Sequence, residues 1–245
     1  MKNKQGKLHP LSQTIRQIAH IFTDMGFEIA DGPYVEDQWH NFDALNVPKD
    51  HPARDMQDTF FVRAMDEQGE AKVLRTHTSS VQIRFMEKFI KEGKKLPFKI
   101  IAPGKVFRNE ATDRTHEAQF HQVEGLVVGE GISLAHLKGT LETFLEKFYG
   151  RKIEFRFRPG YFPFVEPGIE IDLKFGDTWM EVLGAGMVHP QVLENVGIDS
   201  KKYSGFAFGV GIDRLTMMKY QIDDVRNFYQ GDIRIHDAIR EDHKK

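Results

Sequence analysis

The chain has 245 residues, of which 40% are hydrophobic and 29% are charged, so it is large enough to bury a sizeable core. It contains no cysteine, which excludes disulfides, thiolate metal sites and a thiol nucleophile and fits a cytoplasmic protein. We expect neither membrane contact nor a signal peptide, and the net charge of −2 argues against a protein that grips nucleic acid without help from another chain.

The first predicted element is a helix over 11–25, where apolar residues recur at helical spacing before Gly26. Its apolar stripe favours packing on a sheet or on a partner subunit, and the sequence leaves both open. Past Gly32-Pro33, the prolines and polar residues of segment 41–62 indicate a long loop. We expect this loop to be ordered because it contains several large apolar side chains to bury.

The run 74–79 reads LRTHTS and leads into a helix that continues to Ile90. Its threonine and serine side chains are typical of a helix N-cap. Two interpretations of His77 and Ser79 therefore stay open. They either cap the helix or bind a ligand at its N-terminus.

A short strand is predicted over 99–102, and a hairpin is predicted over 104–128. The pair Pro103-Gly104 stands between the predicted strand and the second residue of the hairpin. The hairpin consists of two strands joined by a polar loop that has no apolar run of its own.

Charged and polar side chains share faces of this hairpin. Arg108 and Glu110 lie two residues apart on the first predicted strand, and Gln122 and Glu124 lie two apart on the second. A buried sheet surface would not tolerate such a cluster without partners, because unpaired charges are costly to desolvate. The pattern indicates a cleft that receives a polyanion and an ammonium group.

The second half of the chain is predicted to contain both helices and strands. We expect a helix over 134–148, a strand over 153–158, a rigid aromatic turn over 159–164, strands over 169–173 and 179–183, a glycine-rich turn over 205–211 and a helix over 212–220. Arg214 lies in the first turn of the last helix, where a cation opposes the helix dipole. Functional residues often break such a local rule.

This order of elements indicates an α+β fold with an antiparallel sheet flanked by helices. The chain has neither a GxxxxGK[ST] phosphate loop nor a strand–GxGxxG–helix unit, so a nucleotide would have to bind arginines on the sheet. We expect one domain over 1–245, with 1–8 and 235–245 as loose tails.

Seven stretches of this chain together resemble one known family. They are NFDALNVPKDHPARDMQDTF (41–60), LRTHTSSVQIR (74–84), APGKVFRNE (102–110), THEAQFHQVEGLVV (115–128), FRFRPGYFPFVEPGIEID (155–172), WMEVLGAGMVHPQVL (179–193) and YSGFAFGVGIDRL (203–215). The chain resembles the catalytic alpha subunits of bacterial phenylalanyl-tRNA synthetases, which are class II aminoacyl-tRNA synthetases. The resemblance runs from about His9 to Arg234 and implies a class II catalytic domain.

The resemblance implies an ATP site and three catalytic residues, Arg108, Arg214 and His116. Arg108 would hold the α-phosphate, and Arg214 would face the γ-phosphate, because guanidinium groups bind phosphate bidentately. His116 would lie near the β- or γ-phosphate. Glu110 would contact the adenine amino group, and Phe120 would stack on the adenine ring.

The resemblance also implies a phenylalanine site. Its residues would be His77, Ser79, Gln122, Glu124, Phe162, Phe164, Ala207 and Gly209. Gln122 and Glu124 would hold the ammonium group, while Phe162 and Phe164 would meet the phenyl ring edge-to-face. The alternative for these two phenylalanines is ordinary core packing.

A magnesium ion would accompany ATP in this family. Glu166 and Glu170 carry the carboxylates that such an ion prefers. They are equally suited to structural salt bridges with Arg156 and Arg158, and both interpretations stay open.

The implied function is the formation of phenylalanyl-adenylate and the transfer of its phenylalanyl group to tRNA(Phe). The implied partner is a beta subunit. Self-association through the first helix and the segment to Pro33, which resemble class II motif 1, is the alternative. Only about eight residues precede the matching region, so we expect the N-terminal coiled-coil arm of the family to be absent. Two other functions stay open: a phenylalanine sensor, or an enzyme that charges a different acceptor.

Overall fold

The computed structural model describes residues 6, 8–54 and 58–238 of the chain. Its helices are α1 Pro10–Asp24, α2 Gln38–Asn41, α3 Ser79–Lys91, α4 Leu134–Tyr149, α5 Pro190–Asn195, α6 Ile212–Tyr220 and α7 Ile235–Ala238, with 3-10 turns η1 Asp43–Leu45, η2 Pro52–Arg54 and η3 Val225–Phe228. Its strands are β1 Glu28–Ile29, β2 Val35–Glu36, β3 Phe61–Met65, β4 Ala71–Leu74, β5 Phe98–Phe107, β6 Gln119–Gly129, β7 Phe155–Phe162, β8 Val165–Phe175, β9 Thr178–Val188 and β10 Ser204–Gly211. No helix among the described residues is long and apolar enough to cross a membrane.

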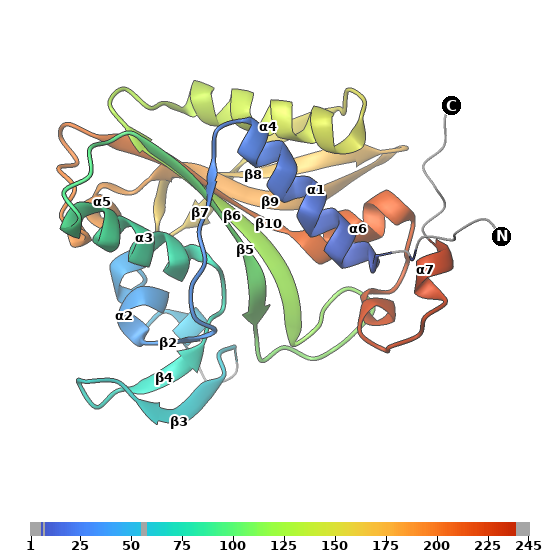
Figure 1. Ribbon diagram of the computed structural model, residues 1–245, viewed down its shortest axis with the longest axis horizontal. Helices are drawn as coiled ribbons and strands as arrows, with labels where there is room; N and C mark the ends of the chain where they lie inside the picture. The colour runs from blue at the N-terminus through green and yellow to red at the C-terminus, as the bar shows by residue number, and fades with distance from the viewer. Residues whose placement is uncertain (1–5, 7, 55–57, 239–245) are drawn as a thin grey trace.

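A seven-stranded sheet forms the centre of the fold, in the order β1-β5-β6-β10-β9-β8-β7. Every neighbouring pair in it is antiparallel except β1 with β5. A small second sheet, β2-β4-β3, lies beside it (Figure 1). The predicted α+β class with an antiparallel sheet and flanking helices is confirmed.

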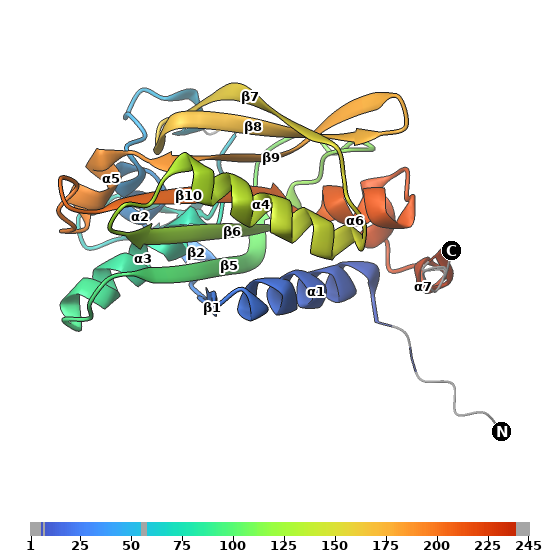
Figure 2. The ribbon, with the colours of Figure 1, turned by 90° about the horizontal axis from the view of Figure 1, so that it is seen from above.

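Two hydrophobic cores cover the two faces of the large sheet. Helices α1, α4 and α6 pack on one face, and α3, α5 and the loop around η1 pack on the other (Figures 1 and 2). Ile18 and Phe22 of α1 are fully buried, and the Phe22 ring stacks on Phe208 of β10 at 5.2 Å. The apolar stripe of the first helix therefore packs on the chain's own sheet.

The predicted break at Pro103-Gly104 is wrong, because β5 runs through it without interruption. Ala30 N–H donates to Ile101 O, so the backbone groups of odd-numbered residues there face β1. Pro103 faces the same side, but β1 has already ended at Ile29, so no neighbouring strand needs its missing N–H. The strand ends at Phe107, and Arg108 and Glu110 lie in the following loop rather than on the strand face.

The predicted glycine-rich turn over 205–211 is also wrong. This segment is β10, a central strand between β6 and β9. Its period of two places Phe206, Phe208 and Val210 in one core, while Ala207 and Gly209 face the other side. The density of glycine hid this alternation in the sequence.

The remaining boundaries differ by a few residues. Strand β7 continues to Phe162, so only Pro163-Phe164 form the turn that was predicted over 159–164. The two strands predicted around Gly176-Asp177 are β8 and β9, each longer than expected. Helix α7 lies inside the segment predicted as a loose C-terminal tail, and residues 239–245 lie outside the described residues.

The side chain of Arg75 takes the place of a neighbouring strand along the open edge of β5. It is 1% exposed, and its Nε donates to Lys105 O at 2.8 Å. Phe107 N–H donates to Arg75 O at 2.9 Å, and Arg75 Nη1 donates to Gly32 O at 3.1 Å. One buried arginine therefore joins the end of β5 to the segment before β2 and to the segment before α3.

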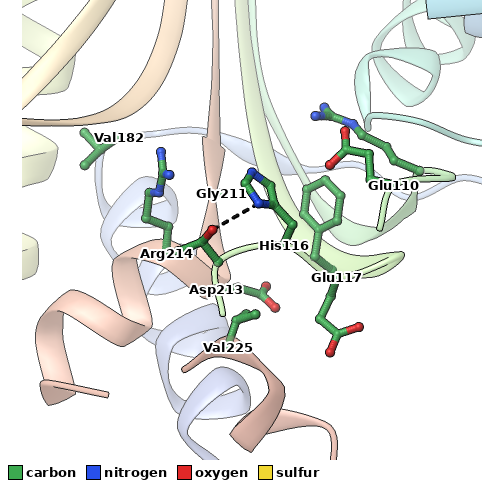
Figure 3. Close-up of a pocket in the computed structure, with 11 residues that line it drawn as sticks. Glu110, His116, Glu117, Val182, Gly211, Asp213, Arg214 and Val225 are labelled. Carbon is green, nitrogen blue, oxygen red and sulfur yellow. Dashed lines mark hydrogen bonds between the residues drawn. The ribbon is translucent and has the colours of Figure 1, made fainter. Parts of the chain in front are cut away.

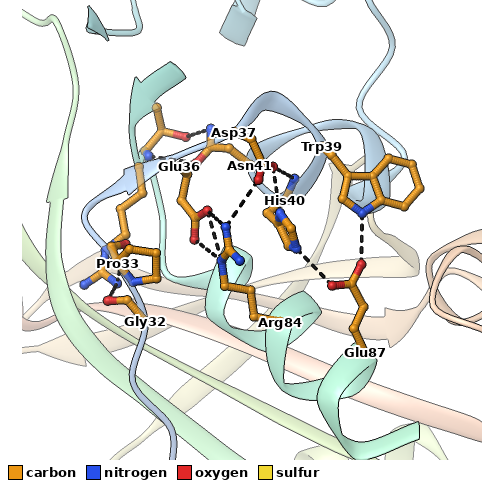
Figure 4. Close-up of polar contacts among 11 residues, drawn as sticks. Gly32, Pro33, Glu36, Asp37, Trp39, His40, Asn41, Arg84 and Glu87 are labelled. Atoms are coloured by element: carbon orange, nitrogen blue, oxygen red, sulfur yellow. Dashed lines mark hydrogen bonds and ion pairs between the residues drawn. The ribbon is translucent and has the colours of Figure 1, made fainter. Parts of the chain in front are cut away.

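A polar network fastens α2 to α3 (Figure 4). The fully buried carboxylate of Glu36 accepts from Arg84 Nε at 2.9 and 3.0 Å. The His40 ring lies between two carboxylates, at 2.6 Å from Asp37 Oδ1 and 2.9 Å from Glu87 Oε2. Helix α2 is only four residues long, so these contacts rather than its own hydrogen bonds fix its position.

We predict that Gly104→Ala destabilises the fold by about 1–3 kcal/mol. A Cβ at Gly104 would lie 2.1 Å from Arg75 Nη2, and the hydrogen bonds of Arg75 prevent it from moving away. Urea unfolding followed by circular dichroism measures the effect. The matched control is Gly139→Ala in α4, where a Cβ meets nothing within 4 Å and helix propensity predicts a gain of up to about 1 kcal/mol. Equal midpoints for the two variants would contradict the role of Arg75.

Candidate active site

Two adjoining cavities open on the same side of the large sheet. The first has a volume of about 200 Å³ and is lined mainly by the loop between β5 and β6 and by the start of α6. The second has a volume of about 400 Å³ and lies over β6, β10 and β9. Arg108, Arg214, Val182 and Gly211 line both, so the two cavities meet at a pair of arginines.

Arg108 is held at the junction by its backbone and by its side chain. Its N–H donates to Ala118 O at 3.0 Å across the base of the β5–β6 loop. Its Nε donates to Thr76 O at 3.2 Å, and its guanidinium lies over the Phe120 ring at 5.1 Å. These contacts place a permanent positive charge where the two cavities join.

Arg214 approaches the same junction from α6. Its Nη1 donates to Glu181 O of β9 at 3.0 Å. Figure 3 shows its guanidinium and the His116 ring on different elements that border the first cavity. Two cations and the N-terminus of α6 together suit a polyanion such as a nucleotide phosphate chain.

The β5–β6 loop is shaped by Asp113. Its Oδ1 accepts from the N–H groups of Thr115 and His116 at 2.6 and 2.8 Å. These hydrogen bonds, first the one from Thr115 N–H, hold the pKa of the Asp113 carboxyl far below its usual range. The loop therefore has a defined turn, and it carries Glu110, His116 and Glu117 into the lining of the first cavity.

All five residues implied for ATP binding line the first cavity. They are Arg108, Glu110, His116, Phe120 and Arg214. All eight residues implied for phenylalanine binding line the second, namely His77, Ser79, Gln122, Glu124, Phe162, Phe164, Ala207 and Gly209. The structure thus brings together residues that are up to 137 positions apart, from His77 to Arg214, although their individual roles stay predictions.

Glu124 is the buried carboxylate of the second cavity, with 6% of its surface exposed. Its Oε1 accepts from Thr78 N–H at 3.0 Å, and its Oε2 accepts from the Ser79 hydroxyl. Burial raises the pKa of the Glu124 carboxyl to about 7, although both hydrogen bonds and the charge of Arg108 pull it down. A positively charged group in this cavity would stabilise the ionised form.

The side chains at the N-terminus of α3 contact the second cavity and do not cap the helix. The Thr78 side chain makes no capping hydrogen bond, and the Ser79 hydroxyl is used by Glu124. Burial, followed by the charge of Arg108, lowers the pKa of His77 to about 3, so its ring is neutral. Among the described residues, His77 Nδ1 and Gln122 Oε1 have no hydrogen-bond partner although they are buried, which is typical of groups that face a ligand.

Phe162 and Phe164 form the aromatic wall of the second cavity. Their rings lie 6.0 Å apart at an interplanar angle of 25°; Phe162 is the last residue of β7, and Phe164 lies in the turn that leads to β8. Both line the cavity, so the alternative of pure core packing does not describe them. A flat apolar group that packs against these rings gains both buried area and favourable ring geometry.

The two glutamates considered for magnesium line neither cavity. Glu170 Oε2 lies 2.9 Å from Arg158 Nη1, as the salt-bridge alternative requires, and Glu166 lies 3.4 Å from His189. Among the described residues, the only cluster of three potential metal-ligand side chains is Glu36, Asp37 and His40, which also lies outside both cavities. The magnesium ligands therefore stay a prediction that this geometry does not support.

The sequence did not point to several residues of the cavity wall. Residues 181–185 of β9 line the second cavity because β9 pairs directly with β10. Gln82 lines it from α3, one helical turn after Ser79. The spacing of Ser79 and Gln82 in a helix gave a usable signal, since residues three apart share a face. The contribution of β9 depended on strand order, which the sequence does not state.

Comparison with known proteins agrees with this geometry. Residues 1–239 match the family described as "tRNA synthetases class II core domain (F)". Phenylalanine–tRNA ligase alpha subunits are similar to this chain: 51% identity in Dehalococcoides mccartyi (94% of this chain, 68% of the relative), 55% in a Wolbachia of Drosophila simulans (94% and 65%) and 50% in Xanthomonas campestris (95% and 69%). The chain thus spans about two thirds of the length of these relatives.

A polar cavity with two arginines beside an antiparallel sheet, together with the match over nearly the whole chain, defines the class. The chain belongs to the class II aminoacyl-tRNA synthetases. Within that class it belongs to the family of phenylalanine–tRNA ligase alpha subunits. The family prediction made from the seven sequence stretches is therefore confirmed.

We predict that Glu124→Gln stabilises the free protein at pH 8 more than at pH 5. Because burial raises the folded-state pKa from 4.5 to about 7, unfolding releases a proton between these values. The free energy of unfolding of the wild type then falls as the pH rises through this window, by an amount on the order of 3 kcal/mol. Because glutamine does not titrate, the free energy of unfolding of Glu124→Gln should not show this fall.

Urea unfolding of both proteins between pH 5 and pH 8 tests this effect. Glu67→Gln, which removes an exposed carboxylate at the tip of the β3–β4 hairpin, is the matched control. Wild-type and Glu124→Gln curves that stay parallel across the pH range would rule out a raised pKa at this site.

Proposed function

We propose that this chain activates L-phenylalanine with ATP, forming phenylalanyl-adenylate and pyrophosphate, and that with a beta subunit it charges tRNA(Phe). One observation carries the proposal: a polar cavity and an aromatic cavity meet at Arg108 and Arg214. Adenylation needs this layout, because the amino-acid carboxylate must reach the α-phosphate of ATP at the junction of two binding sites.

The polar cavity would take ATP. Phe120 offers its ring to adenine, and Glu110 offers a carboxylate to the adenine amino group. Arg108 would bind the α-phosphate, while Arg214 and His116 would face the phosphates that leave as pyrophosphate. A magnesium ion would accompany the phosphates of ATP.

The aromatic cavity would take phenylalanine. Glu124 and Gln122 would accept hydrogen bonds from the ammonium group, and Glu124 would be ionised in the complex because the ammonium charge lowers its pKa. The phenyl ring would lie against Phe162 and Phe164. A tyrosine would then be rejected by shape and by the lack of a partner for its hydroxyl.

The reaction itself requires no protein nucleophile. The carboxylate of the amino acid attacks the α-phosphorus, and the bond to pyrophosphate breaks. The protein aligns the two substrates and surrounds the developing negative charge with Arg108 and Arg214, whose guanidinium groups are positioned before the reaction starts.

A second subunit would complete the enzyme. The net charge of −2 gives the chain little electrostatic attraction for RNA. Ile29, Tyr34 and Val35, on either side of Pro33, are 55%, 51% and 40% exposed, so this segment offers apolar surface to a beta subunit or a second copy of the chain. The buried stripe of α1 is not available for that purpose.

A phenylalanine sensor without catalysis is the second candidate. The aromatic cavity alone would serve such a sensor. A sensor would not require the two arginines or the ordered β5–β6 loop beside the polar cavity. Their presence favours the enzyme.

Phenylalanine-dependent exchange of pyrophosphate into ATP tests the proposal, on the chain alone and with a bacterial beta subunit added. Exchange in either case supports the synthetase. Phenylalanine binding with no exchange under both conditions would favour the sensor instead.

We predict that Arg108→Ala lowers the exchange rate by at least about a thousandfold while the fold stays intact. The reason is the loss of the positive charge at the junction of the cavities. Arg63→Ala, which removes an exposed arginine on β3, is the control and should exchange like the wild type. Near-normal exchange by Arg108→Ala would mean that Arg108 does not hold the reacting phosphate.

We predict that Ala207→Gly admits para-substituted phenylalanines. Ala207 lines the aromatic cavity from β10, and removing its methyl group lengthens the space for the ring. The ratio of kcat/KM for 4-chlorophenylalanine to that for phenylalanine should rise by about tenfold or more. Gly184→Ala, whose Cβ would lie 2.7 Å from Phe162 Cζ, should lower the same ratio. An unchanged ratio in Ala207→Gly would refute this placement of the ring.

A further inference from the structure

The junction of β10 and α6 contains a hydrogen bond that a backbone would ordinarily supply. Strand β10 pairs with β6 as far as Gly211, opposite Gln122, and then turns into α6. His121 is the next residue of β6 along this ladder, and its N–H faces the position that β10 has left. The Oδ2 atom of Asp213 accepts that N–H at 2.8 Å.

The two residues joined by this hydrogen bond are the direct chain neighbours of three residues that line the cavities. The neighbours of His121 on β6 are Phe120, which lines the polar cavity, and Gln122, which lines the aromatic cavity. The neighbour of Asp213 on α6 is Arg214, which lines both. The length of the bond therefore sets how far the first turn of α6 lies from β6.

The other carboxylate oxygen of Asp213 is held as well. The Tyr229 hydroxyl donates to Asp213 Oδ1 and lies 3.1 Å from His121 Nδ1. The Tyr229 and His121 rings are parallel, with centroids 6.3 Å apart. Asp213 is 4% exposed, and burial, followed by the charge of Asp213, raises the pKa of the Tyr229 hydroxyl, which keeps its proton and donates.

The segment that contains Tyr229 also reaches the opposite wall of the polar cavity. Val225 N–H of η3 donates to Arg114 O at 3.0 Å, and Arg114 Nη2 lies 3.3 Å from Asp223 Oδ2. Arg114 belongs to the same loop as His116. One short stretch, 223–229, thus contacts the loop on one side of the cavity and the α6 turn on the other.

We propose that Asp213 is a positioning residue for Arg214, and that Tyr229 orients the Asp213 carboxylate for this task. The inference rests on the proposed function, because Arg214 is assigned there to the phosphates of ATP. Figure 3 shows the two adjacent side chains pointing in different directions, Arg214 upward past Gly211 and Asp213 away from it. Asp213 also lines the polar cavity, but His121 N–H and the Tyr229 hydroxyl already occupy its two carboxylate oxygens. Its effect on the nucleotide is therefore assigned to the helix turn and not to direct contact.

A merely structural role would produce a different response to mutation. A buried acid paired with a tyrosine stabilises many folds, and its removal would loosen the whole α6 helix. A positioning role requires that the effect on ATP pass through Arg214 and disappear when Arg214 is removed. A double-mutant cycle separates the two.

The experiment measures the affinity for magnesium–ATP by calorimetry in four proteins: the wild type, Tyr229→Phe, Arg214→Ala and the double variant. Tyr229→Phe should weaken ATP binding by about tenfold, as expected when a hydrogen bond to a charged group is lost. In the Arg214→Ala background, the same change should have less than a twofold effect. Effects that multiply in the double variant would overturn the proposal.

Further variants test whether a general loosening of α6 would explain the loss of ATP affinity. Thr216→Val removes a buried hydroxyl that donates to Ile212 O inside α6, so it loosens the same helix without touching Asp213. It should leave ATP affinity within twofold of the wild type, and a loss equal to that of Tyr229→Phe would overturn the proposal. Asp213→Asn keeps an acceptor for His121 N–H and should retain more affinity than Asp213→Ala.

The outcome is independent of the exchange assay. If the wild type binds ATP but does not exchange pyrophosphate, the proposed function fails while the cycle still decides the role of Asp213. If the wild type does not bind magnesium–ATP at all, this inference fails together with the assignment of Arg214.

Discussion

The open edge of β5 is the constraint on which the site depends. Strand β1 covers only Ile100 and Ile101 of β5, and beyond that point the backbone groups of the strand have no neighbouring strand. Buried backbone groups without partners are costly, so something else must satisfy them. Arg75 does so through its Nε to Lys105 O and its own carbonyl to Phe107 N–H. Arg75 thereby supplies the hydrogen bonds that a neighbouring strand would otherwise make.

The residues that directly follow Arg75 in the chain contact residues of both cavities. Thr76, the next residue, accepts from Arg108 Nε through its carbonyl and donates its N–H to Asn41 Oδ1. Two residues later, Thr78 and Ser79 bind the two oxygens of Glu124. A stretch of five residues thus holds Arg108 on one side and the buried carboxylate of Glu124 on the other. Their separation is set by backbone geometry, which is stiffer than any side chain.

How far the sequence predicted this arrangement depended on the kind of signal. The predicted site residues that line the two cavities could be named from the sequence because the family resemblance spans separate motifs that meet in space, and no periodicity argument links His77 to Gly209. The break placed at Pro103-Gly104 was wrong because the cost of a strand proline depends on its neighbour, and the end of β1 cannot be read locally. The role of Gly104 needed Arg75 in three dimensions, since its missing Cβ makes room for that guanidinium.

Strand β10 shows why the floor of the aromatic cavity cannot be separated from the core beneath it. Its even-numbered residues Phe206, Phe208 and Val210 are buried on one face, while Ala207 and Gly209 line the cavity on the other. The Phe208 ring fills the space above Gly125, where a Cβ would lie 2.1 Å from its Cζ. A larger residue at Gly209 would approach Glu124 Cγ to 3.2 Å. The small residues of β10 leave space in the cavity close to the strand backbone. The large residues on its other face pack in the core and hold the strand in place.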